Sequence, residues 1–168
     1  MTTENPTRPQ GRLMLTIAWV IALGGLTWFF QIREDKQFNP NAQLSTSGPQ
    51  ELTLVSNRQH HYVATGAING KAVTFLLDTG ASDVVIPGRL AQTHNLASGA
   101  PGIAQTANGM VKVYSTRLDH VQLGPINLYQ VPASINPSMD DNTVLLGMSA
   151  LHQLELVQKD GQLTLRTH

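Results

Sequence analysis

The sequence predicts an all-β domain, folded as a closed barrel or sandwich with one or two short helices, that follows a single transmembrane helix. Two observations lead to this prediction. Three Asn-Gly or Asp-Gly pairs, at residues 69–70, 108–109 and 160–161, each lie between runs of strand-forming residues. Such pairs readily adopt the positive φ angles of two-residue hairpin turns. The second observation is an uncharged, apolar stretch from residue 13 to residue 32.

Residues 13–32 are long enough to cross a membrane, because twenty residues at about 1.5 Å each span the roughly 30 Å hydrocarbon core of a bilayer. Trp28, Phe29 and Phe30 lie at one end, where aromatic side chains favour the membrane interface. A cleaved signal peptide is the alternative. The stretch exceeds the ~7–15 apolar residues of such peptides, and no small-x-small cleavage site follows it. We therefore expect an uncleaved anchor.

The charges that flank the anchor are balanced, with Arg8 and Arg12 before it and Arg33 and Lys36 after it. The positive-inside rule therefore does not orient it. The tail of residues 1–12 is short, and the domain after the anchor is large. We expect the tail inside and the domain outside.

Residues 33–50 are polar and are interrupted by Pro40 and Pro49. This composition cannot bury a core and predicts a flexible tether. The folded domain then occupies residues 51–168.

Within the domain, strand-like runs alternate with turn signals. Leu154 and Leu156 share one face of a predicted strand in the last hairpin, and a Gly124-Pro125 turn joins another pair of strands. Short helices are expected at about 88–94 and 148–153. Many short strands with closely spaced turns favour a compact barrel or sandwich.

Composition narrows the range of partners. The chain has 11 basic and 11 acidic residues, so no positive surplus exists to neutralise phosphates, and nucleic acid is not an expected partner. It has no cysteine, which excludes disulfides and thiolate metal sites. Its six histidines lack the spacing of a metal site. We expect neither a metal nor another cofactor.

The segment from residue 74 to residue 87, TFLLDTGASDVVIP, places a carboxylate between two apolar runs. An aspartate that ends a strand is commonly only a turn residue, and D-T-G alone carries little weight. Here, however, Asp78 would lie at the mouth of the core. If a second identical carboxylate came within hydrogen-bond distance, the two could not both ionise. One would then serve as a base toward water, and the other as an acid toward a carbonyl oxygen.

Three elements of the sequence, in this order along the chain, together match one protein family. Residues 78–81, D-T-G-A, match the catalytic loop of that family. A glycine-tipped hairpin, T-A-N-G-M, lies at residues 106–110, where the family has its flap. Residues 145–147, L-L-G, match the element that braces the catalytic loop, and a short helical segment follows them. Taken together, these elements resemble the retropepsin-like aspartic proteases, and their membrane-anchored bacterial branch in particular. The resemblance covers residues 51–168 and implies a retropepsin-like barrel.

The resemblance also implies the role of each residue. Asp78 is the catalytic residue, and Thr79 bonds across a dimer. The backbones of Gly80 and Ala81 contact substrate, and Ser82 completes the loop. The flap, which binds substrate, comprises Ala107, Asn108, Gly109 and Met110. The residues that brace the loop are Leu145, Leu146 and Gly147.

One chain supplies only one catalytic aspartate, because no other aspartate is followed by Thr-Gly or Ser-Gly. The resemblance therefore implies a homodimer with one active site on its two-fold axis. Retroviral members carry an Asp and an Arg that support the dimer, where this chain has Ser82 and Met148. Weak dimerisation of the isolated domain is the resulting hypothesis.

The resulting interpretation is a membrane-anchored aspartic endopeptidase that cleaves polypeptides through an Asp78 pair. Its expected location is a bacterial inner membrane, with the catalytic domain in the periplasm. Because a fold does not fix a function, a non-catalytic dimerisation or peptide-binding module is the alternative. A third interpretation is a structural membrane-tethered β domain in which Asp78 is an ordinary turn residue.

Overall fold

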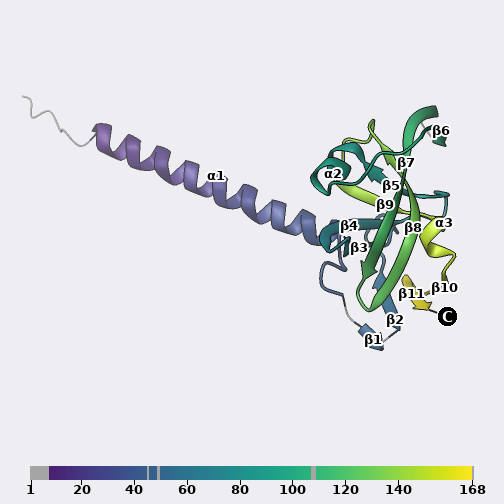
Figure 1. Cartoon of the computed structure of the whole chain (residues 1–168). Coiled ribbons are helices and arrows are strands. Elements are labelled where there is room, and N and C mark those ends of the chain that lie inside the picture. Colours follow the sequence, from purple (N-terminus) through teal and green to yellow (C-terminus); the bar gives the residue numbers. More distant parts are fainter. Residues whose placement is uncertain (1–7, 45, 49, 107–108, 168) are drawn as a thin grey trace, which may run out of the picture. The chain divides into compact units, whose positions relative to one another are not determined.

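The computed structural model describes residues 8–44, 46–48, 50–106 and 109–167. The chain forms two compact units, Met1–Gln37 and Phe38–His168. The described part of the first unit is helical and belongs to α1 (Arg8–Phe38). The strands of the described residues all lie in the second unit, together with two short helices (Figure 1).

Helix α1 contains a stretch, Gly11–Phe38, that is long and apolar enough to cross a membrane by length and composition, with a mean hydropathy of 2.0 over its most apolar 18-residue window. Its large apolar side chains are exposed on all sides, Trp19 and Trp28 among them. The hydroxyls of Thr16 and Thr27 donate to backbone carbonyls one turn earlier in the helix. Both of these hydroxyls are thus satisfied within the helix.

Six strands of the second unit close into a barrel, which confirms the predicted all-β fold. In order around the barrel they are β3 (Val63–Ile68), β4 (Lys71–Leu77), β9 (Thr143–Leu146), β5 (Val84–Pro87), β8 (Ile126–Asn136) and β7 (Gly109–Leu123). The barrel closes because β3 also pairs with β7, where Ala67 lies opposite Gln122 and Ile68 opposite Val121. β6 (Pro101–Thr106) pairs with the first part of β7.

A second sheet has four antiparallel strands. Their order is β1 (Thr46–Gly48), β2 (Glu51–Val55), β11 (Gln162–Thr167) and β10 (Leu154–Lys159). Leu163 and Leu165 of β11 are buried, whereas Arg166, which directly follows Leu165, is exposed. The alternation expected in this hairpin is therefore present.

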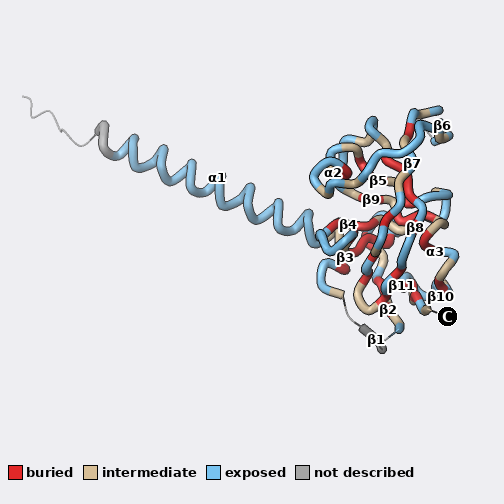
Figure 2. The backbone as a smooth tube through the Cα atoms, in the orientation of Figure 1, coloured by how far each residue is buried: buried red, intermediate tan, exposed pale blue. Residues whose placement is uncertain are grey.

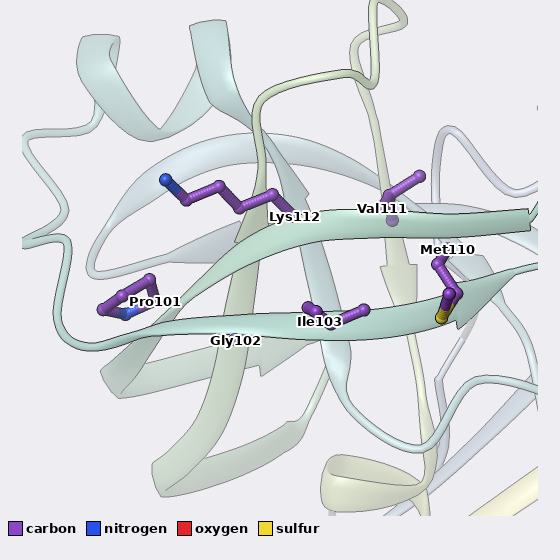
Figure 3. A pocket seen from close by; sticks show the side chains of 6 residues that line it. All are labelled: Pro101, Gly102, Ile103, Met110, Val111 and Lys112. Carbon is purple, nitrogen blue, oxygen red and sulfur yellow. The ribbon is translucent and has the colours of Figure 1, made fainter.

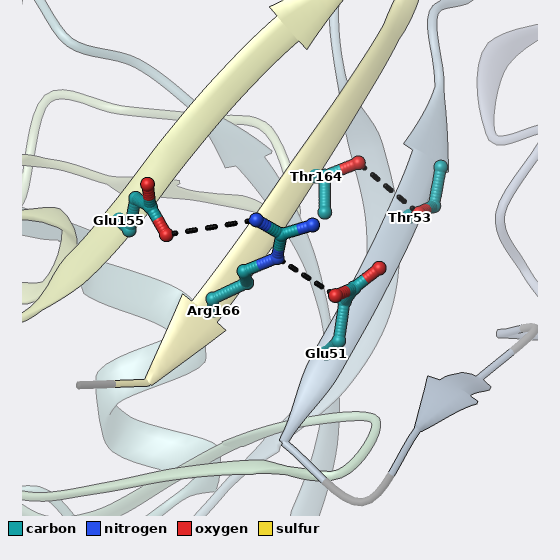
Figure 4. A network of polar contacts seen from close by, with 5 residues as sticks. All are labelled: Glu51, Thr53, Glu155, Thr164 and Arg166. Carbon is teal, nitrogen blue, oxygen red and sulfur yellow. Dashed lines mark hydrogen bonds and ion pairs between the residues drawn. The ribbon is translucent and has the colours of Figure 1, made fainter.

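Polar side chains bridge the strands of this second sheet (Figure 4). The Nε atom of Arg166 lies 2.7 Å from Oε2 of Glu51, and Nη1 lies 3.8 Å from Oε2 of Glu155. The hydrogen bond that Arg166 donates to Glu51, and then the negative charge of Glu51, raise the pKa of Arg166. The hydroxyls of Thr53 and Thr164 approach to 3.2 Å. These contacts tie β11 to both of its neighbours.

The turns follow the dipeptides that predicted them. Asn69 and Gly70 have φ angles of 49° and 78°, and Asp160 and Gly161 have φ angles of 50° and 75°. Asn and Gly tolerate this left-handed region better than other residues do. Gly109, with φ of 108°, begins β7 in the third hairpin. The expected short helices are α2 (Gly88–Thr93) and α3 (Met148–Leu151).

One hydrophobic core joins the barrel to the second sheet (Figure 2). Phe75 of β4 is fully buried, as are Leu52 and Leu165 of the second sheet and Leu151 of α3. Burying an aliphatic or aromatic side chain of this size contributes about 2 kcal/mol relative to leaving it exposed. The second sheet is therefore part of the folded domain.

The structure differs from the prediction that residues 33–50 form a flexible tether. Helix α1 continues to Phe38, and Asn41 is 6 % exposed. The Asn41 side-chain amide donates to the carbonyls of Val55 and Val63, and its oxygen accepts from the Val55 N–H, each at 2.8 Å. A polar side chain thus takes part in the strand network, which composition did not reveal. The compact unit begins at Phe38, and residues 45 and 49 lie outside the described part.

Candidate active site

The catalytic loop expected from the sequence, residues 78–82, connects two strands of the barrel. β4 delivers Asp78 from the core, and β5 takes the chain back into it. Asp78 is half-buried, whereas Thr79, Gly80 and Ser82 are exposed. The arrangement therefore presents a short turn at the end of two core strands.

The turn is shaped by its own hydrogen bonds. The Gly80 N–H donates to Oδ1 of Asp78 at 2.9 Å, and the Ala81 N–H donates to the Asp78 carbonyl at 3.2 Å. Within the described residues, Oδ2 of Asp78 makes no hydrogen bond. One carboxylate oxygen is therefore fixed by the loop, and the other is available to a water molecule or to a second acid.

Strand β9 supports the catalytic loop because it pairs with both strands that the loop connects, β4 and β5. Leu146 pairs in parallel with Leu77 of β4, and Leu145 pairs with Val85 of β5. The Asp78 N–H donates to the Leu146 carbonyl at 3.1 Å. The structure thus brings the predicted bracing residues directly against the predicted catalytic loop.

Gly147, the residue after β9, packs against the backbone of the catalytic loop. A Cβ atom on Gly147 would lie 2.1 Å from the carbonyl oxygen of Asp83 and 2.7 Å from that of Ala81. No side chain fits there without moving the loop backbone. Beyond it, the N–H of Met148 donates to the Ala81 carbonyl at 2.8 Å. The glycine permits a close backbone approach that makes this bond possible.

Ser149 is a further support that sequence reasoning missed. Its hydroxyl accepts from the Val84 N–H at 2.9 Å and donates to the Pro132 carbonyl at 2.7 Å. Its own N–H donates to the Ser82 carbonyl at 2.8 Å. This residue therefore links the end of the loop to β8. The only available signal was its place directly after the bracing segment.

The predicted flap corresponds to the β6–β7 hairpin. Gly109 and Met110 pair with Thr106 and Gln105, and the Thr106 hydroxyl donates to the Gly109 carbonyl at 2.8 Å. Ala107 and Asn108 lie outside the described residues. The Met110 side chain is 76 % exposed.

The hairpin carries a hollow of about 370 Å³ (Figure 3). It is lined by Pro101, Gly102, Ile103, Met110, Val111 and Lys112. Ile103 is 74 % exposed, so apolar groups on both strands are available for contact. The Lys112 ammonium lies 5.3 Å from the centre of the Tyr114 ring, a cation–π distance.

A second hollow, of about 290 Å³, lies where the catalytic loop meets the second sheet. Leu77 and Thr79 line it from the loop side, and Leu156 and Leu163 line it from the sheet. The exposed Thr79 is therefore next to a recess lined by both apolar and polar side chains, His60 and Gln158 among the polar ones. Among the described residues, no three His, Asp or Glu side chains gather in a group able to hold a metal ion.

Comparison with known families agrees with this geometry. Residues 64–153, which include the catalytic loop and its brace, match the family described as gag-polyprotein putative aspartyl protease. The chain belongs to this family. The crystal structure of a retropepsin-like aspartic protease from Rickettsia conorii superposes on this retropepsin-like chain with a TM-score of 0.57 and 26 % identity. The match covers 68 % of this chain and 97 % of the Rickettsia chain. The predicted retropepsin-like fold is therefore confirmed.

A curated protein from Sinorhizobium sp., "Uncharacterized protein in cobV 5'region", is 30 % identical to the retropepsin-like chain over 125 residues. The match covers 72 % of this chain. It covers 54 % of the Sinorhizobium protein, so the chain spans about half the length of that relative.

Proposed function

We propose that this protein is a membrane-anchored aspartic endopeptidase whose active site forms from two Asp78 carboxylates across a homodimer. The observation that carries the proposal is the braced Asp78 turn, held half-buried at the end of two core strands. A rigid turn with one engaged and one available carboxylate oxygen suits an acid that must meet an identical partner. Membership of an aspartic protease family agrees with this reading.

The single Asp-Thr-Gly sequence in the chain supports the dimer. General acid–base hydrolysis by this route needs two carboxyl groups that share one proton. A two-fold axis beside Asp78 would supply the second one, because symmetry places identical residues face to face. Thr79 and Gly80 are exposed next to it, as residues at such an axis must be before the chains pair.

In the proposed reaction, the ionised Asp78 takes a proton from a water molecule as the water oxygen bonds to the peptide carbonyl carbon. The protonated Asp78 of the other chain gives its proton to the carbonyl oxygen. The tetrahedral intermediate then loses its amine: one carboxyl protonates the nitrogen, the other accepts a hydroxyl proton, and the C–N bond breaks. The pair regains its single shared proton, so the cycle is balanced.

The β6–β7 hairpin is the proposed substrate cover. An extended peptide would lie beside it as an added strand, with its side chains directed alternately to the two faces. Gly109 has φ of 108°, which suits a tight hairpin tip, and Met110 and Ile103 offer apolar contact. We assign Ala107 and Asn108 to the same cover. The Gly80 and Ala81 backbones would contact the peptide from below.

Helix α1 is the proposed anchor, spanning a bacterial inner membrane with the domain in the periplasm. Its length, its hydropathy and its exposed apolar side chains support the spanning role. Residues 13–32 are the proposed membrane core of this helix.

The test uses the full chain in detergent micelles, with a random peptide library as substrate, across acidic to neutral pH. Asp78→Asn replaces both carboxyls of the proposed pair, one in each chain, by amides of the same shape. We expect cleavage to fall at least about 100-fold. Asp83→Asn, which changes an exposed carboxylate next to the same loop, is the matched control and should retain cleavage. If the folded wild-type chain pairs but cleaves nothing, the binding-module alternative replaces this proposal.

A further inference from the structure

The connection between helix α1 and the domain is much shorter than its composition suggested. The last residue of the uncharged apolar stretch is Ile32, and the domain holds Asn41 by three hydrogen bonds of 2.8 Å. Two further contacts secure the same segment. Asn57 donates to the Phe38 carbonyl at 3.2 Å, and Asn39 donates to the Thr65 hydroxyl at 3.0 Å.

These contacts make Phe38–Asn41 part of the domain. Asn41 also forms an isolated parallel bridge with Ala64 of β3. Its amide satisfies both the N–H and the carbonyl of Val55, which a flexible tether could not do. Only residues 33–37 then lie between the apolar stretch and the domain.

The chain from Ile32 to Asn41 advances nine residues. Fully stretched, nine residues reach about 31 Å. Because residues 33–38 are helical, the reach is closer to about 20 Å. The domain of residues 38–168 has an expected radius of gyration of about 14 Å, and so a diameter of roughly 40 Å. The connection is therefore shorter than the domain that it holds.

We propose that the preferred substrates are membrane-anchored polypeptides cut within about 60 Å of the bilayer surface, on the side that carries the domain. This limit is the reach of the connection together with one domain diameter. The inference rests on the proposed peptidase function and on α1 as the anchor. It adds the class of substrate, which the catalytic residues do not specify.

Co-anchoring favours such substrates over free ones. Two partners held in one membrane meet at an effective concentration that their connections set, reaching the millimolar range for short connections. A cleavable segment held too far from the membrane surface is not cleaved faster by co-anchoring, because its effective concentration at the active site falls to zero when the connections cannot span the distance. The short connection thus selects substrates by distance from the membrane.

The experiment places the full chain in phospholipid vesicles with a reporter polypeptide. The reporter has its own transmembrane helix, a rigid helical spacer and one cleavable segment. That segment is the best-cleaved peptide of the random library in micelles. Spacers hold it about 30 Å or about 100 Å from the surface, since a helix rises about 1.5 Å per residue. A second protein variant carries 60 Gly/Ser residues between Gln37 and Phe38, with a root-mean-square span of about 43 Å.

We expect the full chain to cleave the near reporter at least tenfold faster than the far one. The Gly/Ser variant should cut the far reporter within about threefold of the near one. The same Gly/Ser segment placed ahead of Met1 is the matched control and should leave the tenfold preference intact.

Equal cleavage of both reporters by the full chain would overturn the inference, and so would a preference that the insertion does not relieve. Failure of the proposed function is distinguishable. In that case neither the reporters nor the free peptide is cleaved in an Asp78-dependent way, and the Asp78→Asn chain matches the wild type throughout.

Discussion

Gly147 lies where any side chain would meet the backbone of the catalytic loop. A Cβ atom there would be 2.1 Å from the Asp83 carbonyl oxygen, a separation that only a backbone shift can relieve. Because β9 pairs with strands on both sides of the loop, the shift would disturb the loop and the barrel together.

We expect Gly147→Ala to lower the free energy of unfolding of the Phe38–His168 domain by about 3 kcal/mol, as overpacking a tight site does. Urea unfolding followed by far-ultraviolet circular dichroism measures this, since both tryptophans lie in α1 outside the domain. Gly102→Ala is the matched control, because its nearest neighbour would be 3.8 Å away. A Gly147→Ala domain as stable as the control would contradict the bracing role.

Whether a residue could be predicted from the sequence depended on how far its partners lie along the chain. Asp78 and Gly147 stood out because short motifs contain them. Ser149 and Asn41 did not, since their importance depends on partners that only the fold supplies. Ser149 bonds to Pro132, and Asn41 bonds to Val55 and Val63. A serine or an asparagine in a polar stretch carries no local sign of such contacts.

At the scale of elements, hairpins were the most predictable feature. Asn-Gly and Asp-Gly pairs impose a turn locally, whatever the rest of the chain does. Closure of the barrel was expected only as a class of fold. The β3–β7 pairing that closes it joins residues more than fifty positions apart, and no local pattern encodes it. The same reason explains the second sheet, where β2 pairs with β11 from the far end of the chain.

The start of the domain offers a test at the same scale. A domain beginning at Phe38 keeps the Asn41 contacts and β1, whereas one beginning at Glu51 loses both. Three lost hydrogen bonds at about 1 kcal/mol each predict that the shorter domain is less stable by about 3 kcal/mol. Urea unfolding of the two domains measures the difference.

Two substitutions in the longer domain identify the contacts that cause the difference in stability. Asn41→Ala should reproduce most of the loss, because it leaves the Val55 and Val63 groups without these partners. Gln43→Ala, at an exposed position two residues further on, should change stability by no more than about 0.5 kcal/mol. Equal stability of the long and short domains would favour a tether at residues 39–50, which is the non-helical part of the tether predicted at residues 33–50.

For the whole molecule, pairing is the property on which the proposed chemistry depends. Ser82 and Met148 occupy positions where retroviral proteases place a supporting acidic and basic residue. No charge pair of that kind assists association here. Two anchors in one membrane would compensate, because confinement raises the effective concentration of the domains. We therefore expect the full chain to be active in vesicles at concentrations where the isolated domain is mostly monomeric.

Mixing catalytic and inactive domains tests pairing directly. If each active site needs two Asp78 residues, a wild-type domain paired with an Asp78→Asn domain cannot cleave. With a tenfold excess of Asp78→Asn domain, at concentrations where all domains pair, random pairing should lower activity per wild-type domain about tenfold. Below that range, activity of the wild-type domain alone should rise more steeply than its concentration. An equal excess of albumin controls for non-specific effects on the substrate. If the inactive domain has no effect while activity stays proportional to wild-type concentration, one chain suffices for cleavage and the shared-proton pair is wrong.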